Sequence, residues 1–407
     1  MPFILWKPLS FLYLYWRRFD CWMPKQTRVV LEIKMSRQVL KPIRAMETVM
    51  ASLHGAVYHP PDWWEKWIDG QVQLSLQFEI AAIDGETHFY IRTPVKYRDS
   101  VEAAIYSQYP EAELQEVADY TKLVPQNMPN QDWDLFGTDY TLVADDHYPI
   151  RTYRQFETEH ELKEEKRIDP IANLLEAMAR VKPGEQFWIQ IAASPRAQED
   201  LAAWLEKGRT IRDKLARRPE KPKPKPIIQE AAGILITGKV GEEEKPQEII
   251  PPEMKLTPGE REIITGLEEK MTKPIFDTVI RFIYFGKRKV FFRGNFRLAF
   301  TFFNTYMTTN LNGLVPLGRT FCKIHKSWFL PLNLLRPRRH YLRCRKIFRN
   351  YIQRLPPFYP LSGGTFILNT EELASLFHFP GEVVAPAPGG PWIEAKKGGA
   401  PSELPME

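Results

Sequence analysis

The residues best suited to chemistry form a cysteine and histidine pattern in the C-terminal third of the chain. Cys322-x2-His325 is followed by His340-x3-Cys344. Ligands with this spacing could surround a zinc ion tetrahedrally. Lysine and arginine crowd the pattern and no CxxC pair accompanies it, which favours packed or exposed side chains instead. We therefore predict no metal site. A zinc site formed by Cys322, His325, His340 and Cys344 is the alternative.

The same region carries a strong charge bias. From Arg281 to Thr370 the sequence holds 17 Lys and Arg and no Asp or Glu, and because the whole chain has a net charge of +6, removing these charges leaves −11 for the rest. The basic side chains on or beside one predicted helix are Arg336, Arg338, Arg339, Arg343, Arg345, Lys346, Arg349 and Arg354. To all of them except Arg354 we assign binding to nucleic-acid phosphates or anionic lipid headgroups. Pairing with acidic residues of the same chain is the alternative.

The signatures of common enzymes are missing from the sequence. There is no GxxxxGK[ST], GxSxG, HExxH or GxGxxG motif, and Gly238-Lys239 and Gly286-Lys287 lack the upstream glycine and the following hydroxyl of a phosphate loop. We therefore predict no cofactor and no enzymatic activity. An enzyme with an unrecognised site remains a third class of function.

The N-terminus predicts an interfacial membrane anchor. Lys7 and Pro8 interrupt its apolar run, which falls short of the roughly 20 residues that a bilayer span needs. The predicted anchor residues are Trp6, Tyr13, Trp16, Arg17, Arg18 and Trp22, since aromatic rings suit the headgroup level and arginines favour the cytoplasmic face. With three cysteines in 407 residues, we expect a reducing compartment and a place at the cytoplasmic face of the cell membrane. An ordinary packed helix is the alternative.

Hydrophobic periodicity predicts a first module over residues 27–125. A β-branched strand (Arg28 to Met35) precedes a helical stripe, and strict alternation from Gln71 to Ile80 predicts a half-buried strand. Asp84-Gly85 marks a hairpin, and a further helix and strand follow it. This βαββαβ order is that of a ferredoxin-like sheet.

One face of that sheet carries polar residues and a single aromatic side chain. They are Gln73, Ser75, Gln77, His88, Tyr90 and Arg92. RNA-binding sheets of this topology stack bases on two or three aromatic residues. One tyrosine gives little support for that role, and a solvated or domain-facing surface is the competing interpretation.

A second pass of the same elements covers residues 130–320. Helical patterns at 198–215 and 261–271 flank a proline-rich insertion at 218–256, which contains the spacer Pro219 to Pro226. We predict an α+β chain with two tandem ferredoxin-like modules. Besides the modules, it has an anchor at 1–26, a basic segment at 321–360 and a proline-rich connector at 361–407.

Several segments resemble the N-terminal, membrane-proximal region of type IV secretion or conjugation-type DNA-transfer ATPases. They are Ala45-Met46-Glu47, Leu53-His54-Gly55, FEIAAIDGETHFYIRTP from Phe78, VEAAIYSQYPEAELQEVADY from Val101, DPIANLLEAMARVKPGEQFWIQIAASP from Asp169 and LNTEELASLFHFPG from Leu368. In that family, transmembrane helices precede these domains, and a RecA-like motor follows a proline-rich linker. The resemblance implies the half of such a machine that precedes the motor.

We therefore expect a non-enzymatic, membrane-proximal domain of a DNA-transfer machine that lacks its own phosphate-loop motor. Its expected partners are a separately encoded ATPase motor or other secretion subunits, the membrane surface, DNA and a second copy of the chain. A free-standing nucleic-acid-binding protein that uses the basic C-terminal third is the alternative. The sequence identifies neither the transferred substrate nor the oligomeric state, and it leaves open a truncated ATPase gene.

Overall fold

The protein is described by a computed structural model that covers residues 2–36, 41–156, 169–218, 256–326, 328, 333–380 and 392–393. The chain divides into a larger unit, Met1–Ala197 with Lys273–Glu407, and a smaller unit, Gln198–Thr272. The predicted spacer Pro219 to Pro226 and almost all of the predicted insertion 218–256 lie outside the described residues. The larger unit holds the sheet and all candidate site residues.

The N-terminal half of the sheet follows the order strand, helix, strand, strand, helix, strand. Its elements are β1 (Arg28–Ser36), α2 (Ile43–Val57), β2 (Leu76–Ile83), β3 (Glu86–Pro94), α3 (Arg98–Gln108) and β4 (Glu113–Val117). Asp84 and Gly85 both have positive φ, which matches the right-handed twist of a two-residue hairpin turn. The strands lie side by side in the order β4, β1, β3, β2, and every neighbouring pair is antiparallel.

The second half of the sheet repeats this order. Its elements are β5 (Trp133–Leu142), α5 (Ala172–Ala179), β6 (Glu185–Pro195), β7 (Ile275–Lys287), α9 (Arg297–Asn304) and β8 (Leu314–Pro316). The strands lie in the order β8, β5, β7, β6, again with antiparallel neighbours, and β2 pairs with β6 to join the halves. Among the described strands, β10 (Trp392–Ile393) forms a parallel pair with β1. The predicted α+β class is confirmed.

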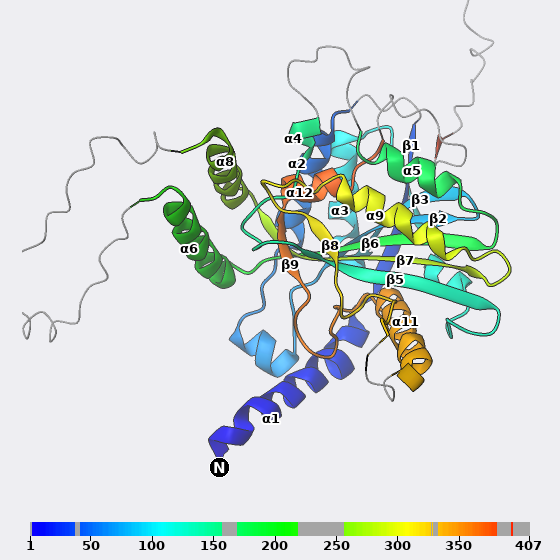
Figure 1. The fold of residues 1–407 in the computed structure, drawn as a ribbon. Coiled ribbons are helices and arrows are strands. Elements are labelled where there is room, and N and C mark those ends of the chain that lie inside the picture. The colour runs from blue at the N-terminus through cyan, green and yellow to red at the C-terminus, as the bar shows by residue number, and fades with distance from the viewer. Residues whose placement is uncertain are drawn as a thin grey trace, which may run out of the picture. The chain divides into compact units, whose positions relative to one another are not determined.

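The two faces of the sheet are covered differently (Figure 1). Helices α2, α3, α5, α9 and α12 (Thr370–Leu376) cover one face, while α1 (Pro2–Trp16) and α11 (Arg336–Ile352) lie on the opposite side. The helical face is rich in aromatic contacts, since Phe78 and Phe89 both pack against Phe377. Short elements complete the larger unit: η1 (Arg17–Trp22), η2 (Met23–Lys25), η3 (Glu65–Asp69), η4 (Val95–Tyr97), η5 (Tyr120–Leu123), α4 (Tyr153–Phe156), η8 (Arg293–Phe296) and β9 (Phe366–Asn369).

Strand β2 is more deeply buried than its alternation predicted. Both faces of the strand are covered, and the polar residues Gln77 and Glu79 are as inaccessible as their apolar neighbours. Such burial is tolerated because Glu79 accepts hydrogen bonds from Tyr120 and Gln190 and forms an ion pair with Arg354. The prediction of a half-buried strand is therefore wrong.

Part of the predicted connector 361–407 belongs to the fold. Strand β9 pairs with β7, and α12 follows it directly and is buried along its whole length. Asn369 and Glu372 form a capping box that satisfies backbone N–H groups at the start of α12. Residues 366–380 are therefore structural rather than a linker, because β9 extends the sheet and α12 packs on α2.

The smaller unit contains two helices, α6 (Gln198–Leu215) and α8 (Pro258–Thr272). The predicted helical patterns at 198–215 and 261–271 correspond to them. Ion pairs link the helices: Arg212 lies 3.4 Å from Glu268, and Arg217 lies 3.1 Å from Glu260. These pairs are largely exposed, so each contributes little to stability.

Candidate membrane and anion-binding surface

Helix α1 exposes apolar side chains that a packed helix would bury. Trp6 is 64% exposed, Leu12 60% and Trp16 51%. An ordinary surface helix turns its apolar stripe toward the core, whereas α1 leaves much of its apolar surface uncovered within the described structure. None of the helices in the described part of the chain combines the length and the apolar character required to span a bilayer.

The C-terminal end of α1 and the following η1 attach this helix to the larger unit. The hydroxyls of Tyr15 and Tyr359 lie 2.6 Å apart, and Phe19 packs edge-on against the ring of Tyr359. Tyr13 donates a hydrogen bond to the carbonyl of Trp67 at 2.9 Å. Helix α1 is thus attached at its C-terminal end. Within the described residues, Trp6 at the other end forms no comparable hydrogen bond or ring contact.

A second pair of aromatic side chains lies just before η3, which contacts η1. Trp63 and Trp64 are 63% and 65% exposed. Arg17 donates to the carbonyl of Ile68, and Gly70 permits the close approach, since it has φ +76° and a Cβ there would lie 2.6 Å from the carbonyl carbon of Arg17. Sequence analysis did not select Trp63 and Trp64, although the adjacent tryptophans were a visible signal.

The predicted anchor residues therefore differ in position. Trp6, Tyr13 and Trp16 are exposed, whereas Arg17, Arg18 and Trp22 are partly buried. Burial lowers the pKa of the Arg18 guanidinium. The aromatic residues of α1 fit an interfacial role, and Arg17 ties the segment after α1 to the carbonyl of Ile68.

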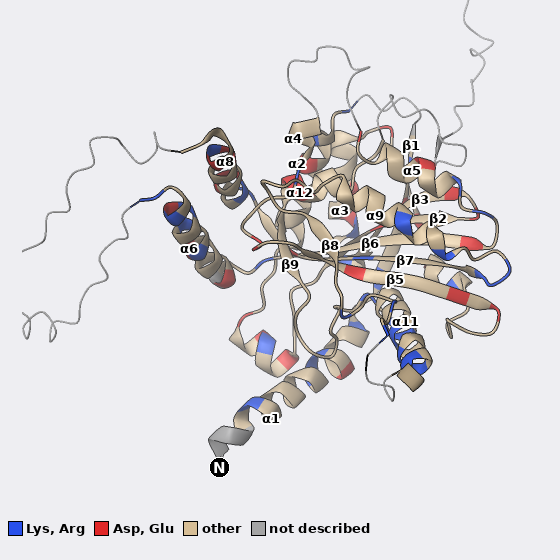
Figure 2. Cartoon of the chain, in the orientation of Figure 1, with Lys and Arg blue, Asp and Glu red and all other residues tan. Residues whose placement is uncertain are grey.

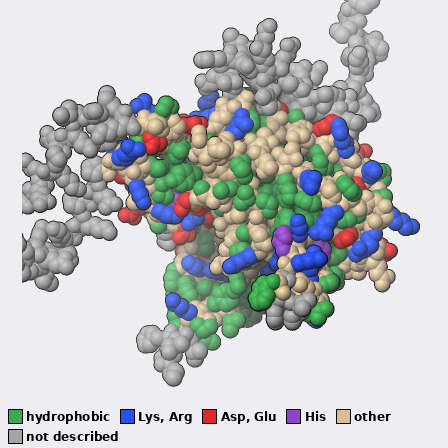
Figure 3. Space-filling model, viewed as in Figure 1, with side chains coloured by type: hydrophobic (Ala, Val, Ile, Leu, Met, Phe, Trp, Pro, Cys, Tyr) green, Lys and Arg blue, Asp and Glu red, His purple; other side chains and the backbone are tan. Residues whose placement is uncertain are grey.

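Helix α11 separates an inner apolar face from an outer cationic face (Figure 2). Its buried face includes Ile347 and Phe348 and packs against the sheet at β5. The exposed cations on the other face are Arg338, Arg339, Arg345, Lys346 and Arg349. None of them forms an ion pair with an acidic residue in the described ranges. Figure 3 shows hydrophobic side chains gathered over α1 and basic ones over α11.

Two of the predicted binding arginines on α11 have structural roles. The Arg336 Nε donates to the carbonyl of Ile324 at 2.8 Å, and Arg343 donates to the carbonyl of Phe321 at 2.9 Å. These bonds fix the segment before α11 to the helix. The side chains are only partly exposed, so we exclude them from the outer cationic face.

Arg354, just beyond α11, points inward. Its guanidinium lies 3.1 Å from Glu79 and 2.6 Å from Asp119, and its side chain is 2% exposed. Burial alone would lower the pKa of Arg354, but Glu79 and Asp119 together hold it well above its usual value. Arg354 also has φ +54°, a costly conformation for a non-glycine residue, and these ion pairs hold it there.

Arg281, on β7, is also paired internally. Its Nε lies 2.5 Å from Asp139 on β5, and a further nitrogen donates to the carbonyl of Leu355 at 3.0 Å. The Arg281 side chain is completely buried. For Arg281 and Arg354, pairing with acidic residues of the same chain is the correct interpretation.

Three of the four candidate zinc ligands lie close together: His340 and Cys344 on α11, and Cys322 on the segment before it. Cys344 Sγ is 3.7 Å from the Nε2 of His340 and interacts with Cys322, while His325 is exposed. A hydrogen bond with Cys322, opposed by burial and assisted by His340, lowers the pKa of Cys344 to about 6. Burial raises the pKa of Cys322. With His325 exposed, the four residues do not converge on one tetrahedral site.

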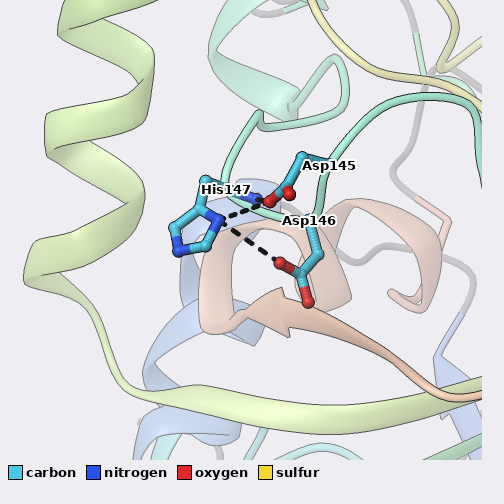
Figure 4. A group of neighbouring side chains, drawn as sticks. All are labelled: Asp145, Asp146 and His147. Carbon is cyan, nitrogen blue, oxygen red and sulfur yellow. Dashed lines mark hydrogen bonds and ion pairs between the residues drawn. The ribbon is translucent and has the colours of Figure 1, made fainter. Parts of the chain in front are cut away.

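A different loop brings possible metal ligands closer together (Figure 4). Among the described residues, Asp145, Asp146 and His147 form the group that places one ligand atom each within 4.8 Å of one another. His147 Nδ1 lies 2.5 Å from Asp145 and 3.4 Å from Asp146. Asn312 fixes the loop by donating to the Asp145 carbonyl at 3.0 Å. This group was not among the predicted sites, because its only indication in the sequence is three consecutive residues of types that bind metals.

The fold and surface define an α+β protein with one mainly antiparallel sheet, an exposed apolar helix and a cationic helix. A family model described as "Domain of unknown function (DUF8128)" matches residues 32–313, which is more than half of the chain. The chain therefore belongs to this family. No curated protein matches it. The matched range begins within β1 and ends at the residue before β8, whereas α1 and α11 lie outside it.

Proposed function

We propose that this chain is a non-enzymatic, membrane-proximal domain of a type IV secretion or conjugative DNA-transfer machine at the cytoplasmic face of the cell membrane. One observation carries the membrane assignment: the exposed apolar residues of α1 and the outer cations of α11 lie on the same side of the sheet (Figures 1 and 3).

Two different interactions would hold the domain at a bilayer. The indole rings of Trp6 and Trp16 suit the headgroup region, where their apolar and polar parts are both satisfied. Each outer cation of α11 would add about 1 kcal/mol near an anionic surface. Stable anchoring generally needs two such signals, and this surface offers both.

The place in a DNA-transfer machine rests on the resemblance of the segments starting at Phe78, Val101, Asp169 and Leu368. The repeated strand order supports the finer fold proposal that 27–125 and 130–320 are tandem ferredoxin-like modules, since antiparallel βαββαβ units have this order. In this role the domain positions other subunits, and a separately encoded ATPase supplies the motor.

A free-standing nucleic-acid-binding protein is the second candidate. The outer cations of α11 have no described acidic partner, and such a helix can bind phosphates without reading bases. By contrast, Tyr90 is buried and stacks on Tyr120, so it cannot stack on an RNA base. Any nucleic-acid contact would therefore use α11 rather than this sheet face.

Sedimentation with phosphatidylcholine vesicles, with and without phosphatidylglycerol, tests the membrane assignment. We expect the chain to bind the anionic vesicles and the L9S/L12S variant to bind at least about tenfold more weakly, since two exposed apolar side chains of α1 are lost. Val143→Ser, at an exposed site just after β5, is the matched control and should bind like the parent. Equal binding of all three proteins would contradict the anchor.

The absence of catalysis has its own test. The purified chain should hydrolyse no ATP above background, with or without DNA. Turnover that a single substitution within the chain abolishes would overturn the non-enzymatic part of the proposal.

A further inference from the structure

A pocket opens on the same side of the sheet as α11, apart from the outer cations of that helix. Its volume is about 370 Å³, and it is lined by residues from β1, β3, β6 and β7, from η1 and η2, and from the segment after α11. It therefore draws on both halves of the sheet. This volume lies within the range of sites that enclose a small organic ligand.

Three arginines reach the pocket, and only one of them is compensated. Arg354 is paired with Glu79 and Asp119, as described above. Arg28 contacts the sulfur of Met23 at 3.9 Å, and the Arg92 side chain forms no hydrogen bond or ion pair with any residue in the described ranges. Both side chains are partly buried and line the pocket.

The nearby carboxylates are already used. Asp277, which also lines the pocket, lies 2.7 Å from Arg196. Burial together with Arg354 and Arg28 lowers the pKa of Arg92 to about 10. Arg28, Arg92 and Arg354 bring three positive charges and Glu79 and Asp119 two negative ones, so one positive charge stays unbalanced, and an anion would relieve the repulsion.

The remaining lining is amphipathic. Phe19, Val279 and Leu355 provide apolar walls. Ser75, just before β2, adds a hydroxyl, whereas the amide of the neighbouring Gln73 is already bonded to the His59 N–H and the Val57 carbonyl. A ligand that fits this lining has an anionic end and an apolar body.

We propose that this pocket binds a phosphate ester that carries an apolar group, and that Arg28 and Arg92 hold the phosphate. A phosphate has more acceptor oxygens than a carboxylate, so it can bond to the side chains of both Arg28 and Arg92, and each planar guanidinium fork can donate two parallel hydrogen bonds. The apolar group would lie against the wall of Phe19, Val279 and Leu355. This inference stands without the proposed function, because the outer cations of α11 do not line the pocket.

The phosphate ester has two chemical sources, a phospholipid headgroup and a soluble metabolite. Isothermal titration of the full chain with dihexanoyl phosphatidic acid, adenosine monophosphate and inorganic phosphate separates them. We expect one of the two esters to bind at least about tenfold more tightly than inorganic phosphate, since only the esters reach the apolar wall. The tighter ester identifies the source.

Arg28→Gln and Arg92→Gln should each weaken that ester by at least about tenfold, since each removes a charge-assisted contact. Arg92→Lys should recover only part of the loss, because an ammonium group cannot form the fork. Arg44→Gln, at an exposed site on α2, should bind like the parent.

A readout without ligand separates binding from folding. If Arg92 is retained for a ligand, Arg92→Gln relieves repulsion and should melt no lower than the parent when no ligand is present. Failure of the parent to bind either ester would overturn the proposal, as would undiminished binding by both glutamine variants. A marked fall in the ligand-free melting temperature of Arg92→Gln with unchanged ester affinity would assign Arg92 a structural role instead.

Discussion

The acid-free stretch from Arg281 to Thr370 contains both buried, paired arginines and outward-facing arginines that have no ion pair among the described residues, and the sequence does not distinguish the two. Arg281 and Arg354 are buried and paired with carboxylates, whereas the outer cations of α11, such as Arg338 and Arg349, face outward without an acidic partner in the described ranges. A single run of positive charge therefore has two physical roles, internal neutralisation and a free cationic surface.

The difference arises from where the carboxylates lie. Glu79, Asp119 and Asp139 come from the N-terminal half of the chain, where Glu79 and Asp119 meet Arg354 after α11 and Asp139 meets Arg281 on β7. The outer face of α11 turns away from the sheet and from these residues. The acidic remainder of the chain neutralises the inward-directed Arg281 and Arg354, and at the surface Asp134 lies 3.4 Å from Arg288. The outer cations of α11 have no such partner in the described ranges.

Removing one buried arginine should give the largest difference in stability between the buried and the outer arginines. Arg354→Met should lower the free energy of unfolding by about 3–5 kcal/mol, because it leaves Glu79 and Asp119 buried without their cation. Urea denaturation measures this loss. The same substitution at Arg349 is the control and should change stability by less than about 0.5 kcal/mol. Equal stabilities of the two variants would show that buried and outer arginines do not differ in their contribution to folding.

Acid should weaken the buried ion pair between Asp119 and Arg354. Burial alone would raise the pKa of Asp119, but Arg354 holds it below its usual value, so Asp119 stabilises the fold at pH values above its unfolded pKa of about 4. That contribution is lost as pH falls through the lower folded pKa. The melting temperature of Asp119→Asn should start lower at neutral pH and fall less than that of the parent on acidification. Parallel curves would show that Asp119 is not linked to stability.

Within α11, the comparison predicts smaller effects that differ between neighbours. Arg343→Gln should destabilise by about 1 kcal/mol, because its hydrogen bond to the Phe321 carbonyl is lost. Arg338→Gln and Arg339→Gln should each stay within about 0.5 kcal/mol of the parent. Thermal unfolding of the three variants measures the difference, and identical shifts would place Arg343 with the outer cations.

Local patterns predicted most of the elements. The β-branched run at β1, the Asp84-Gly85 turn and the helical pattern of α6 gave bounds close to those observed, because each depends on neighbouring residues. The α+β class follows from their order. These features need no knowledge of distant contacts.

The features that sequence patterns missed depend on contacts between distant segments. The alternation at β2 predicted one solvated face, and only the approach of the segment after α11 buries Glu79. Residues 366–380 were assigned to a connector because they lie beside proline-rich sequence, yet β9 finds its partner in β7. The roles of Arg343 and Arg354 likewise depend on where the carbonyl of Phe321 and the buried carboxylates lie.

The central claim is that the outer cations of α11 face an anionic membrane. The decisive variant replaces Arg338, Arg339, Arg345, Lys346 and Arg349 by Gln and keeps the structural Arg336 and Arg343. Its affinities for phosphatidylglycerol-containing vesicles and for duplex DNA are measured over a range of salt concentrations. The control replaces Lys287 and Lys289, exposed cations at the end of β7, by Gln and keeps Arg288, which lies 3.4 Å from Asp134.

At low salt we predict that the α11 variant loses at least about a hundredfold in vesicle affinity, since each cation near the surface contributes about 1 kcal/mol, while the control changes far less. Any DNA binding by the parent should be weak in comparison. The contradicting result is unchanged vesicle binding together with a DNA salt dependence that flattens by about 0.9 per lost contact. That result would assign the outer face of α11 to nucleic acid.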